Sequence, residues 1–277
     1  MSDKNLQTIE AQKKIIADLN NKLVKCEEAR SHFISNIRNE IINPFASIQG
    51  LAKLIITSNK VEWKKVISIA SLIHKESFLL DFQLMNIFSA AELESGETKI
   101  DFYNANISDL FITEIDNYIV YSKKKKIEIE LIHNNDTEKY AITDLNKLKV
   151  IFVNVLMNAI NFSSENSKVI VNYSIDEESF SFSVQDFGVG MSVEDQKKFF
   201  NRFEKANNDI NSLNIGLGLG LSVIAGYVEL FEGKIKIDSE INKGTLFSIT
   251  IPIPKLNKED LDIANSENEF FFDDDVF

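Results

Sequence analysis

The pattern of apolar and polar positions changes character near residue 97. Before that point, apolar residues recur at spacings of three and four, which is typical of amphipathic helices. After it, short stretches that alternate apolar and polar residues are interleaved with helical stretches. We therefore expect an α+β protein, with a helical N-terminal part and a mixed part that follows it.

The first helical stretch carries a seven-residue repeat of apolar positions, which predicts a parallel dimeric coiled coil over residues 1–30. A lone surface helix is the alternative. The two apolar series consist of Ile9, Ile16, Leu23 and Ile37, and of Leu19, Cys26 and Phe33.

The helical pattern continues through Phe33–Phe45, where Pro44 is expected to end or bend the helix unless neighbouring packing holds it through a kink. A second helix is predicted from about Val61 to Glu94, with Gly96 as its C-cap. Two antiparallel helices with wide apolar stripes cannot bury those stripes alone. Residues 31–96 are therefore predicted to be a helical hairpin that pairs with a second copy as a dimeric four-helix bundle.

The mixed part, residues 97–254, is predicted to be an α/β sandwich because helices and strands follow each other along it. Asp144 is the expected N-cap of its most apolar helix, which runs to Phe162. The other expected helices cover Ile107–Tyr121 and about 218–231. The expected strands are 99–102, 127–131, 168–175, 179–185, 234–239 and 245–252. Residues 255–277 form an acidic tail that we expect to be disordered, a docking peptide or autoinhibitory flap being the alternative.

Composition narrows the class of protein. The formal charge of −12 disfavours nucleic acid as a partner. A single cysteine and three histidines make a disulfide framework or a zinc site improbable. No apolar run is long enough to span a membrane, and the N-terminus lacks a signal peptide, so we expect a soluble cytoplasmic protein.

Four motifs in the mixed part carry candidate chemistry. Asn154 and Asn158 share one helix face and offer neutral oxygens, which suit Mg²⁺ bound together with nucleotide phosphates. Asp186 follows a strand, where a buried carboxylate can accept from an exocyclic amine such as adenine N6. The nearby Gly188 and Gly190 let the backbone approach a ligand. An aromatic turn contains Phe203. A glycine-rich stretch then opens a helix whose free N–H groups suit phosphates, with Gly216, Gly218, Gly220 and Leu221 as its candidate residues.

Each motif is weak alone, but together and in this order they resemble the ATP-binding domain (Bergerat-type) of the histidine-kinase, gyrase, chaperone and mismatch-repair superfamily. The resemblance implies ATP and Mg²⁺ as cofactors. The hydrolysing branches carry a glutamate four residues before the Mg²⁺ asparagine. Here that position is Asn154, which cannot act as a general base. Because a helical hairpin precedes the domain, residues 31–254 resemble the core of a sensor histidine kinase.

The chain departs from that family at the nucleophile. Glu40, Asn43 and Pro44 match the motif of the first helix, but the histidine position holds Asn39. The amide nitrogen has its lone pair delocalised into the carbonyl, so autophosphorylation at residue 39 is excluded. The other histidines, His32, His74 and His133, are expected to be ordinary surface or interface residues. Two smaller departures are Asn161, where the family often carries a basic residue that contacts phosphate, and Leu217, where it often carries Thr or Ser.

Glu40 and Asn43 also match the E-x-x-[T/N] pattern with which this family positions water against the aspartyl phosphate of a response regulator. The alternative is that Asn43 merely precedes a proline. We interpret the chain as a homodimeric histidine-kinase-like protein that binds ATP and Mg²⁺. It would act as a regulatory pseudokinase, as a response-regulator phosphatase, or as both, on a response regulator or another histidine kinase. Two alternatives stay open. One is an active sensor histidine kinase core, seen as a His-to-Asn variant or complemented in a heterodimer. The other is a non-enzymatic, ATP-dependent binding scaffold.

Overall fold

The computed structural model describes residues 13, 16, 20, 24, 41–57, 63–96, 98–133, 140–196 and 219–255. The chain divides into two compact units. The first comprises Met1–Ile87 with Asn211–Gly218, and the second comprises Phe88–Ile210 with Leu219–Phe277. Predictions outside the described residues include most of the coiled coil, the acidic tail and five candidate site residues: Asn39, Glu40, Phe203, Gly216 and Gly218.

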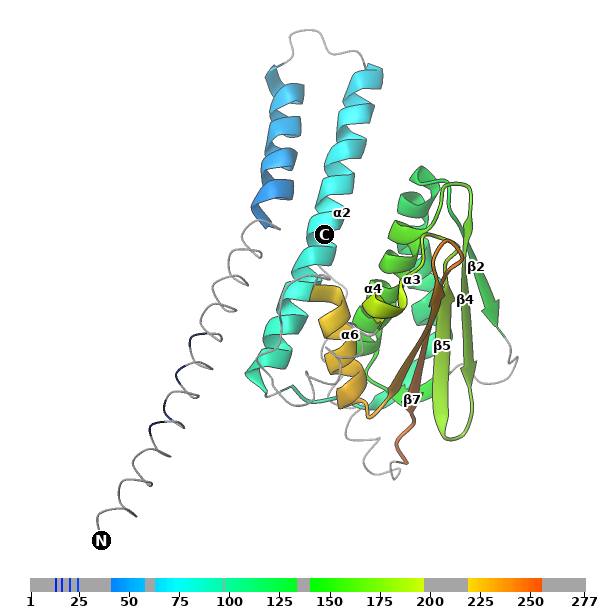
Figure 1. Cartoon of the computed structure of the whole chain (residues 1–277). Coiled ribbons are helices and arrows are strands. Elements are labelled where there is room, and N and C mark those ends of the chain that lie inside the picture. The colour runs from blue at the N-terminus through cyan, green and yellow to red at the C-terminus, as the bar shows by residue number, and fades with distance from the viewer. Residues whose placement is uncertain are drawn as a thin grey trace. The chain divides into compact units, whose positions relative to one another are not determined.

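In the first unit, residues 41–57 form a helix that runs side by side with the first part of the long helix α2 (Trp63–Ser95), whose last residues, from Phe88, belong to the second unit (Figure 1). The first of these helices continues on both sides of Pro44, whose side chain is buried. Pro44 therefore does not end the helix. The predicted second helix is confirmed as α2. It ends before Gly96, which has a φ of 68° and donates its N–H to the carbonyl oxygen of Leu93 at 3.3 Å, as expected of a C-cap.

The second unit is built on a five-stranded sheet in the order β2-β4-β5-β7-β6. β2 and β4 are parallel, and the other neighbours are antiparallel. The strands are β2 (Glu128–His133), β4 (Lys168–Ile175), β5 (Ser179–Gln185), β6 (Lys234–Glu240) and β7 (Gly244–Pro252). The predicted strands 168–175 and 179–185 are confirmed with the same bounds.

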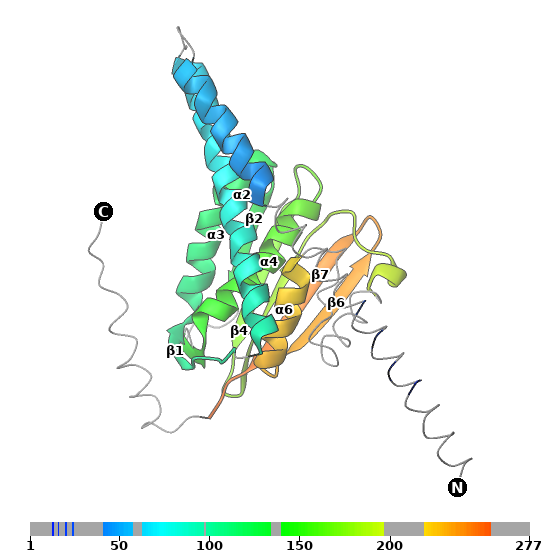
Figure 2. The ribbon, with the colours of Figure 1, turned by 90° about the vertical axis from the view of Figure 1, so that its left-hand side faces the viewer.

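Helices α3 (Ile107–Lys124), α4 (Leu145–Phe162) and α6 (Leu219–Leu230) form one layer against the sheet (Figure 2). On β5, Phe180, Phe182 and Val184 are buried beneath this layer, while the intervening serines lie on the other face. Phe111 of α3 lies at the centre of the core and packs edge-on against Phe152 of α4, with ring centroids 4.5 Å apart. The α/β sandwich is confirmed.

The strand predicted at residues 99–102 is wrong, because this segment has no regular secondary structure. Within it, the N–H of Asp101 donates to Asp144 Oδ2 at 3.2 Å, and just before it Thr98 Oγ1 donates to the carbonyl oxygen of Glu92 at 2.6 Å. The strand begins a few residues later as β1 (Tyr103–Asn106). β1 pairs with β3 (Tyr140–Thr143), which the sequence pattern did not predict.

The N-cap of α4 is the predicted one. Asp144 Oδ1 accepts from the N–H groups of Asn146 and Lys147 at 3.0 and 3.1 Å. Its Oδ2 lies 2.9 Å from Lys147 Nζ, so one carboxylate both caps the helix and pairs a buried ammonium. Among the described residues, no helix combines the length and the apolar character needed to cross a membrane.

Candidate functional site

The candidate site begins with a stripe of three carboxamides along α4. Asn154, Asn158 and Asn161 are spaced by four and three residues and therefore share one face of the helix. Asn154 is only 1% exposed, Asn158 is half-buried and Asn161 is exposed. The stripe therefore leads from the core of the second unit to solvent. A surface patch would be exposed along its whole length, whereas a side of a ligand site is buried at one end.

The first turn of α6 packs directly against the buried end of this stripe. A Cβ on Gly220 would lie 2.2 Å from Asn154 Oδ1, so only glycine permits the approach. The amide nitrogen of Asn154 donates to the carbonyl oxygen of Val150 at 2.9 Å. The N-terminal turn of a helix presents N–H groups that suit an anion. Gly220 and Leu221 thus lie where the sequence places a phosphate site, beside the carboxamide stripe.

Asp186 supplies the negative charge of the site. It directly follows β5, is 6% exposed, and accepts from the N–H of Gly188 at 2.9 Å. Burial raises the pKa of Asp186 above its ordinary value, against the hydrogen bonds of Gly188 and Thr245, which lower it. A buried carboxylate with acceptor capacity to spare is suited to bind a donor such as an exocyclic amine.

The glycine turn after Asp186 is locked between α4 and the β6–β7 turn. A Cβ on Gly188 would lie 1.8 Å from the carbonyl oxygen of Phe162, and one on Gly190 would lie 2.0 Å from that of Glu240. Val189 donates its N–H to the carbonyl oxygen of Phe162 at 3.3 Å. These backbone contacts therefore hold the turn that follows Asp186 against the end of α4, the helix that carries the stripe.

Sequence reasoning missed Thr245, the second residue of β7, which lies beside Asp186. The N–H of Asp186 donates to the carbonyl oxygen of Thr245 at 2.9 Å, and hydrogen bonding by Thr245 lowers the pKa of the carboxyl group. The Thr245 hydroxyl also lies 2.9 Å from Ser239 Oγ. No local motif marks this residue, because its role depends on the pairing of two distant strands.

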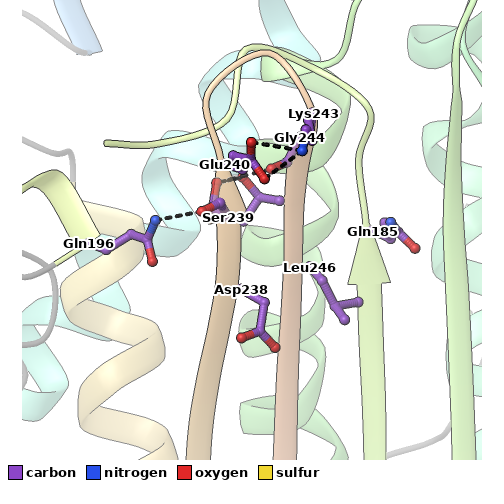
Figure 3. A pocket seen from close by; sticks show the side chains of 9 residues that line it. Gln185, Gln196, Asp238, Ser239, Glu240, Lys243, Gly244 and Leu246 are labelled. Carbon is purple, nitrogen blue, oxygen red and sulfur yellow. Dashed lines mark hydrogen bonds and ion pairs between the residues drawn. The ribbon is translucent and has the colours of Figure 1, made fainter. Parts of the chain in front are cut away.

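A hollow of about 480 Å³ lies at the ends of β5, β6 and β7 (Figure 3). Gln185, Leu246 and Asp238 form one cross-strand row in it, and Gln196 Nε2 donates to the carbonyl oxygen of Ser239 at 2.7 Å. Gln185 follows the buried Val184, so this row faces away from the helical layer. Gly244 and Thr245 also line the hollow, so it adjoins the site around Asp186 through the start of β7.

The chemistry of the donors limits what metal the site can hold. Over the described residues, no group of three His, Cys, Asp or Glu side chains is arranged to bind a metal ion. Asn158 offers a half-buried neutral oxygen, which fits Mg²⁺ when phosphates supply the charged ligands. Asn154, the other predicted ligand, faces Gly220. In the first unit, Asn43 is exposed on the helix of residues 41–57.

Comparison with known proteins agrees with this geometry. Residues 143–255 match the family described as "Histidine kinase-, DNA gyrase B-, and HSP90-like ATPase". Two solved structures share the fold: the histidine kinase AdeS of Acinetobacter baumannii (TM-score 0.52, 16% identity, 78% of this chain and 98% of the other) and full-length ShkA in complex with AMPPNP (TM-score 0.55, 19% identity, 82% of this chain and 46% of the other). The second unit is thus an ATPase domain of this superfamily.

Curated relatives narrow the family. The chain is 28% identical to the sensor histidine kinase GacS of Pseudomonas protegens, over 94% of this chain and 28% of the relative. It is 30% identical to the heme sensor protein HssS of Staphylococcus saprophyticus, over 84% of this chain and 49% of the relative. Over most of its length the chain is thus similar to sensor histidine kinases, and it spans half or less of the length of these two relatives.

Proposed function

We propose that the second unit binds ATP with Mg²⁺, and that the chain is a regulatory pseudokinase because its nucleophile position holds Asn39. Asp186 would accept from the adenine amine, Asn158 would bind Mg²⁺, and the first turn of α6, with Gly220 and Leu221, would receive phosphates. The observation that carries the proposal is the contrast between the donors and acceptors that the described residues bring together and the missing imidazole at residue 39.

The bound Mg²⁺ would neutralise part of the phosphate charge. The residues of the chain hold the nucleotide and exclude water from the adenine end, where Asp186 is buried. Asn154 lacks the basic lone pair that a hydrolytic general base needs, which favours binding over turnover. Phosphoryl transfer would require a nucleophile that residue 39 does not provide.

Incubation with γ-labelled ATP and Mg²⁺ tests this proposal. The unmodified chain should retain no label, whereas Asn39→His should gain acid-labile, alkali-stable label. Asn39→Gln is the matched control without an imidazole, and Asn39→His combined with Asp186→Asn should lose the label again. Label on the unmodified chain would show an active kinase instead.

A second candidate activity is dephosphorylation of a response regulator, which the exposed carboxamide of Asn43 favours. An oriented amide can align a water molecule for in-line attack on the aspartyl phosphate. The P–O bond to the aspartate breaks, releasing the free carboxylate and inorganic phosphate, and no phosphohistidine is needed.

This activity is tested with a phosphorylated response regulator and excess protein. Loss of phosphate should be faster with the unmodified chain than without it, and Asn43→Ala should remove the acceleration. Thr57→Ala, on the same helix at its far end, is a control that should leave the rate unchanged. Equal rates with the unmodified chain and with Asn43→Ala would contradict the role of Asn43, and a rate no faster with the unmodified chain than without it would leave the binding scaffold as the function.

A further inference from the structure

A single serine near the end of β6 fastens the β6–β7 hairpin to the segment that follows the glycine turn. Ser239 Oγ accepts from the N–H of Met191 at 2.8 Å. It also lies 3.0 Å from the carbonyl oxygen of Gly244 and 2.9 Å from Thr245 Oγ1. A hydroxyl group has one proton, so Ser239 donates to only one of these two acceptors at a time. Ser239 is therefore the point at which the hydrogen-bond chain branches.

Gln196 forms a second link between the same two segments (Figure 3). Its Nε2 donates to the carbonyl oxygen of Ser239 at 2.7 Å and to that of Met191 at 3.3 Å. Gln196 lies in a helical stretch that Ser192 caps: Ser192 Oγ accepts from the N–H of Asp195 at 3.1 Å, and the Ser192 carbonyl oxygen accepts from the N–H of Gln196 at 3.0 Å. Met191 and Ser239 are thus joined twice, directly and through Gln196.

Thr245 connects this arrangement to Asp186. The N–H of Asp186 donates to the carbonyl oxygen of Thr245 at 2.9 Å, and the Thr245 hydroxyl donates to the carboxyl group of Asp186, which lowers its pKa. In this arrangement the proton of Ser239 points to Thr245 Oγ1. The N–H of Met191, the two hydroxyl groups and the carboxylate then form one chain in which every donor points the same way. Hydrogen bonds aligned in this manner polarise and strengthen one another.

The opposite arrangement removes a donor from Asp186. If Thr245 donates to Ser239, the serine proton goes to the carbonyl oxygen of Gly244, and the chain ends there. Both arrangements use the same positions of the oxygen atoms, so they differ only in what the carboxyl group receives. Because Asp186 is buried, the donor from Thr245 helps to fix the direction in which its remaining lone pairs point.

We infer that Ser239, held in place by Gln196, is a positioning residue that orients the carboxylate of Asp186 toward the exocyclic amine of the nucleotide base. Ser239 acts through Thr245 rather than by contact with the nucleotide. The inference rests on the proposed ATP binding and concerns how the site distinguishes a purine that carries this amine from one that lacks it. Loss of the Ser239 hydroxyl should therefore reduce that preference and leave the affinity for the rest of the nucleotide unchanged.

Isothermal titration of the full chain in the presence of MgCl₂ tests this inference with two ligands: ATP, and purine riboside 5′-triphosphate, which lacks the exocyclic amine. The unmodified chain should bind ATP more tightly than the analogue. Ser239→Ala should weaken ATP about fivefold, the effect of one net hydrogen bond, and leave the analogue unchanged. Ser239→Thr keeps the hydroxyl group and should bind both ligands as the unmodified chain does.

The matched control is Ser181→Ala on β5. Ser181 Oγ lies 2.9 Å from Ser174 Oγ, so this variant also removes a contact between two hydroxyl groups, but one that has no link to Asp186 through Thr245. It should leave both affinities unchanged.

A double variant tests the route through Thr245. Thr245→Val already interrupts the chain between Ser239 and Asp186, so adding Ser239→Ala should cost no further ATP affinity. Gln196→Met removes the second link while keeping the length of the side chain. It should weaken ATP relative to the analogue, in the same direction as Ser239→Ala.

The outcomes separate the inference from the function on which it rests. Equal ATP affinities of the unmodified chain and Ser239→Ala would overturn the inference alone. So would an equal loss for both ligands, which would mean that Ser239 only packs the hairpin, or additive losses in the double variant. Failure of the unmodified chain to bind ATP would instead overturn the proposed function. If Ser239→Ala does not fold, Gln196→Met carries the test, and an unchanged ratio of its two affinities would contradict the inference.

Discussion

At the scale of single residues, Asp186 shows how a binding role competes with stability. Burial raises the pKa of its carboxyl group, so ionisation is less favourable in the folded than in the unfolded protein. Stability is therefore lost as the pH rises through the unfolded and then the folded pKa of this group, and the loss is complete above both.

Asp186→Asn should accordingly raise the melting temperature of the nucleotide-free protein at neutral pH. The gain should shrink as the pH falls toward the unfolded pKa of aspartate, about 3.9.

Asp176→Asn is the matched control with the opposite sign. N–H groups of Glu178 and Ser179 at 2.9 and 2.7 Å lower the pKa of Asp176, so its loss should destabilise at neutral pH. Thermal unfolding between about pH 4 and pH 7 measures both. A melting temperature of Asp186→Asn that does not exceed that of the unmodified chain at neutral pH would contradict this account.

What the sequence could reveal at this scale depended on local context. Asp186 was identifiable because it follows an alternating strand and precedes two glycines. Thr245 and Ser239 were not, since Asp186 and Met191, which they contact, lie far along the chain: Ser239 meets Met191 across 48 positions. Among the serines of the strands, nothing in the sequence distinguishes the one that joins two segments.

At the scale of elements, the pattern of apolar and polar residues predicted a strand correctly where the burial of alternate side chains alone determines it. Buried and less buried residues alternate along the whole length of β4 and β5, and the bounds of both strands were predicted without error. β3 is four residues long and was not predicted, because it is stabilised chiefly by pairing with β1. Residues 99–102 alternate in the same way as a strand. The backbone N–H of Asp101 nevertheless donates to the side chain of Asp144 and not to a neighbouring strand.

The N-caps of α3 and α4 allow a quantitative test at this scale. Asp144 caps α4 and also pairs with buried Lys147; although burial disfavours the charge, Asp144 and Glu92 raise the pKa of Lys147. Asp144→Ala should therefore cost about 3 kcal/mol, since it also leaves a buried ammonium without its closest partner. Asn106 caps α3 through Asp109 N at 3.2 Å in an exposed setting, and Asn106→Ala should cost about 1 kcal/mol. Chemical denaturation measures both, and equal costs would show that the pair with Lys147 contributes nothing.

At the scale of the whole molecule, the first unit exposes more apolar side chains than a helical pair in isolation should. These residues lie on the helix of residues 41–57 and on α2: Ile42, Phe45, Leu54, Ile56, Trp63, Ile67 and Leu72. Exposed apolar surface of this kind marks an interaction site. It supports our proposal that two copies form a four-helix bundle.

Phe45→Asp should shift the full chain from dimer toward monomer, because a carboxylate would be buried in the proposed bundle. We expect the dimer dissociation constant to rise by at least about tenfold. Light scattering coupled to size-exclusion chromatography, across a concentration series, measures the change. Lys64→Ser, an exposed polar position at the start of α2, should leave the dimer intact. A monomeric unmodified chain would exclude the proposed assembly.

The backbone clamps around the glycine turn affect how any large-scale mutational survey of this protein should be read. A side chain at Gly188, Gly190 or Gly244 would meet a carbonyl oxygen at 1.8, 2.0 and 2.0 Å, whereas one at Gly50 would meet open space. Every substitution of the first three should therefore remove the protein from the soluble pool, whatever its effect on nucleotide. Asp186→Asn should instead leave abundance nearly intact while weakening capture on an immobilised nucleotide. Scoring abundance and capture separately would distinguish the positions that are needed for folding of the site from those that contact the nucleotide.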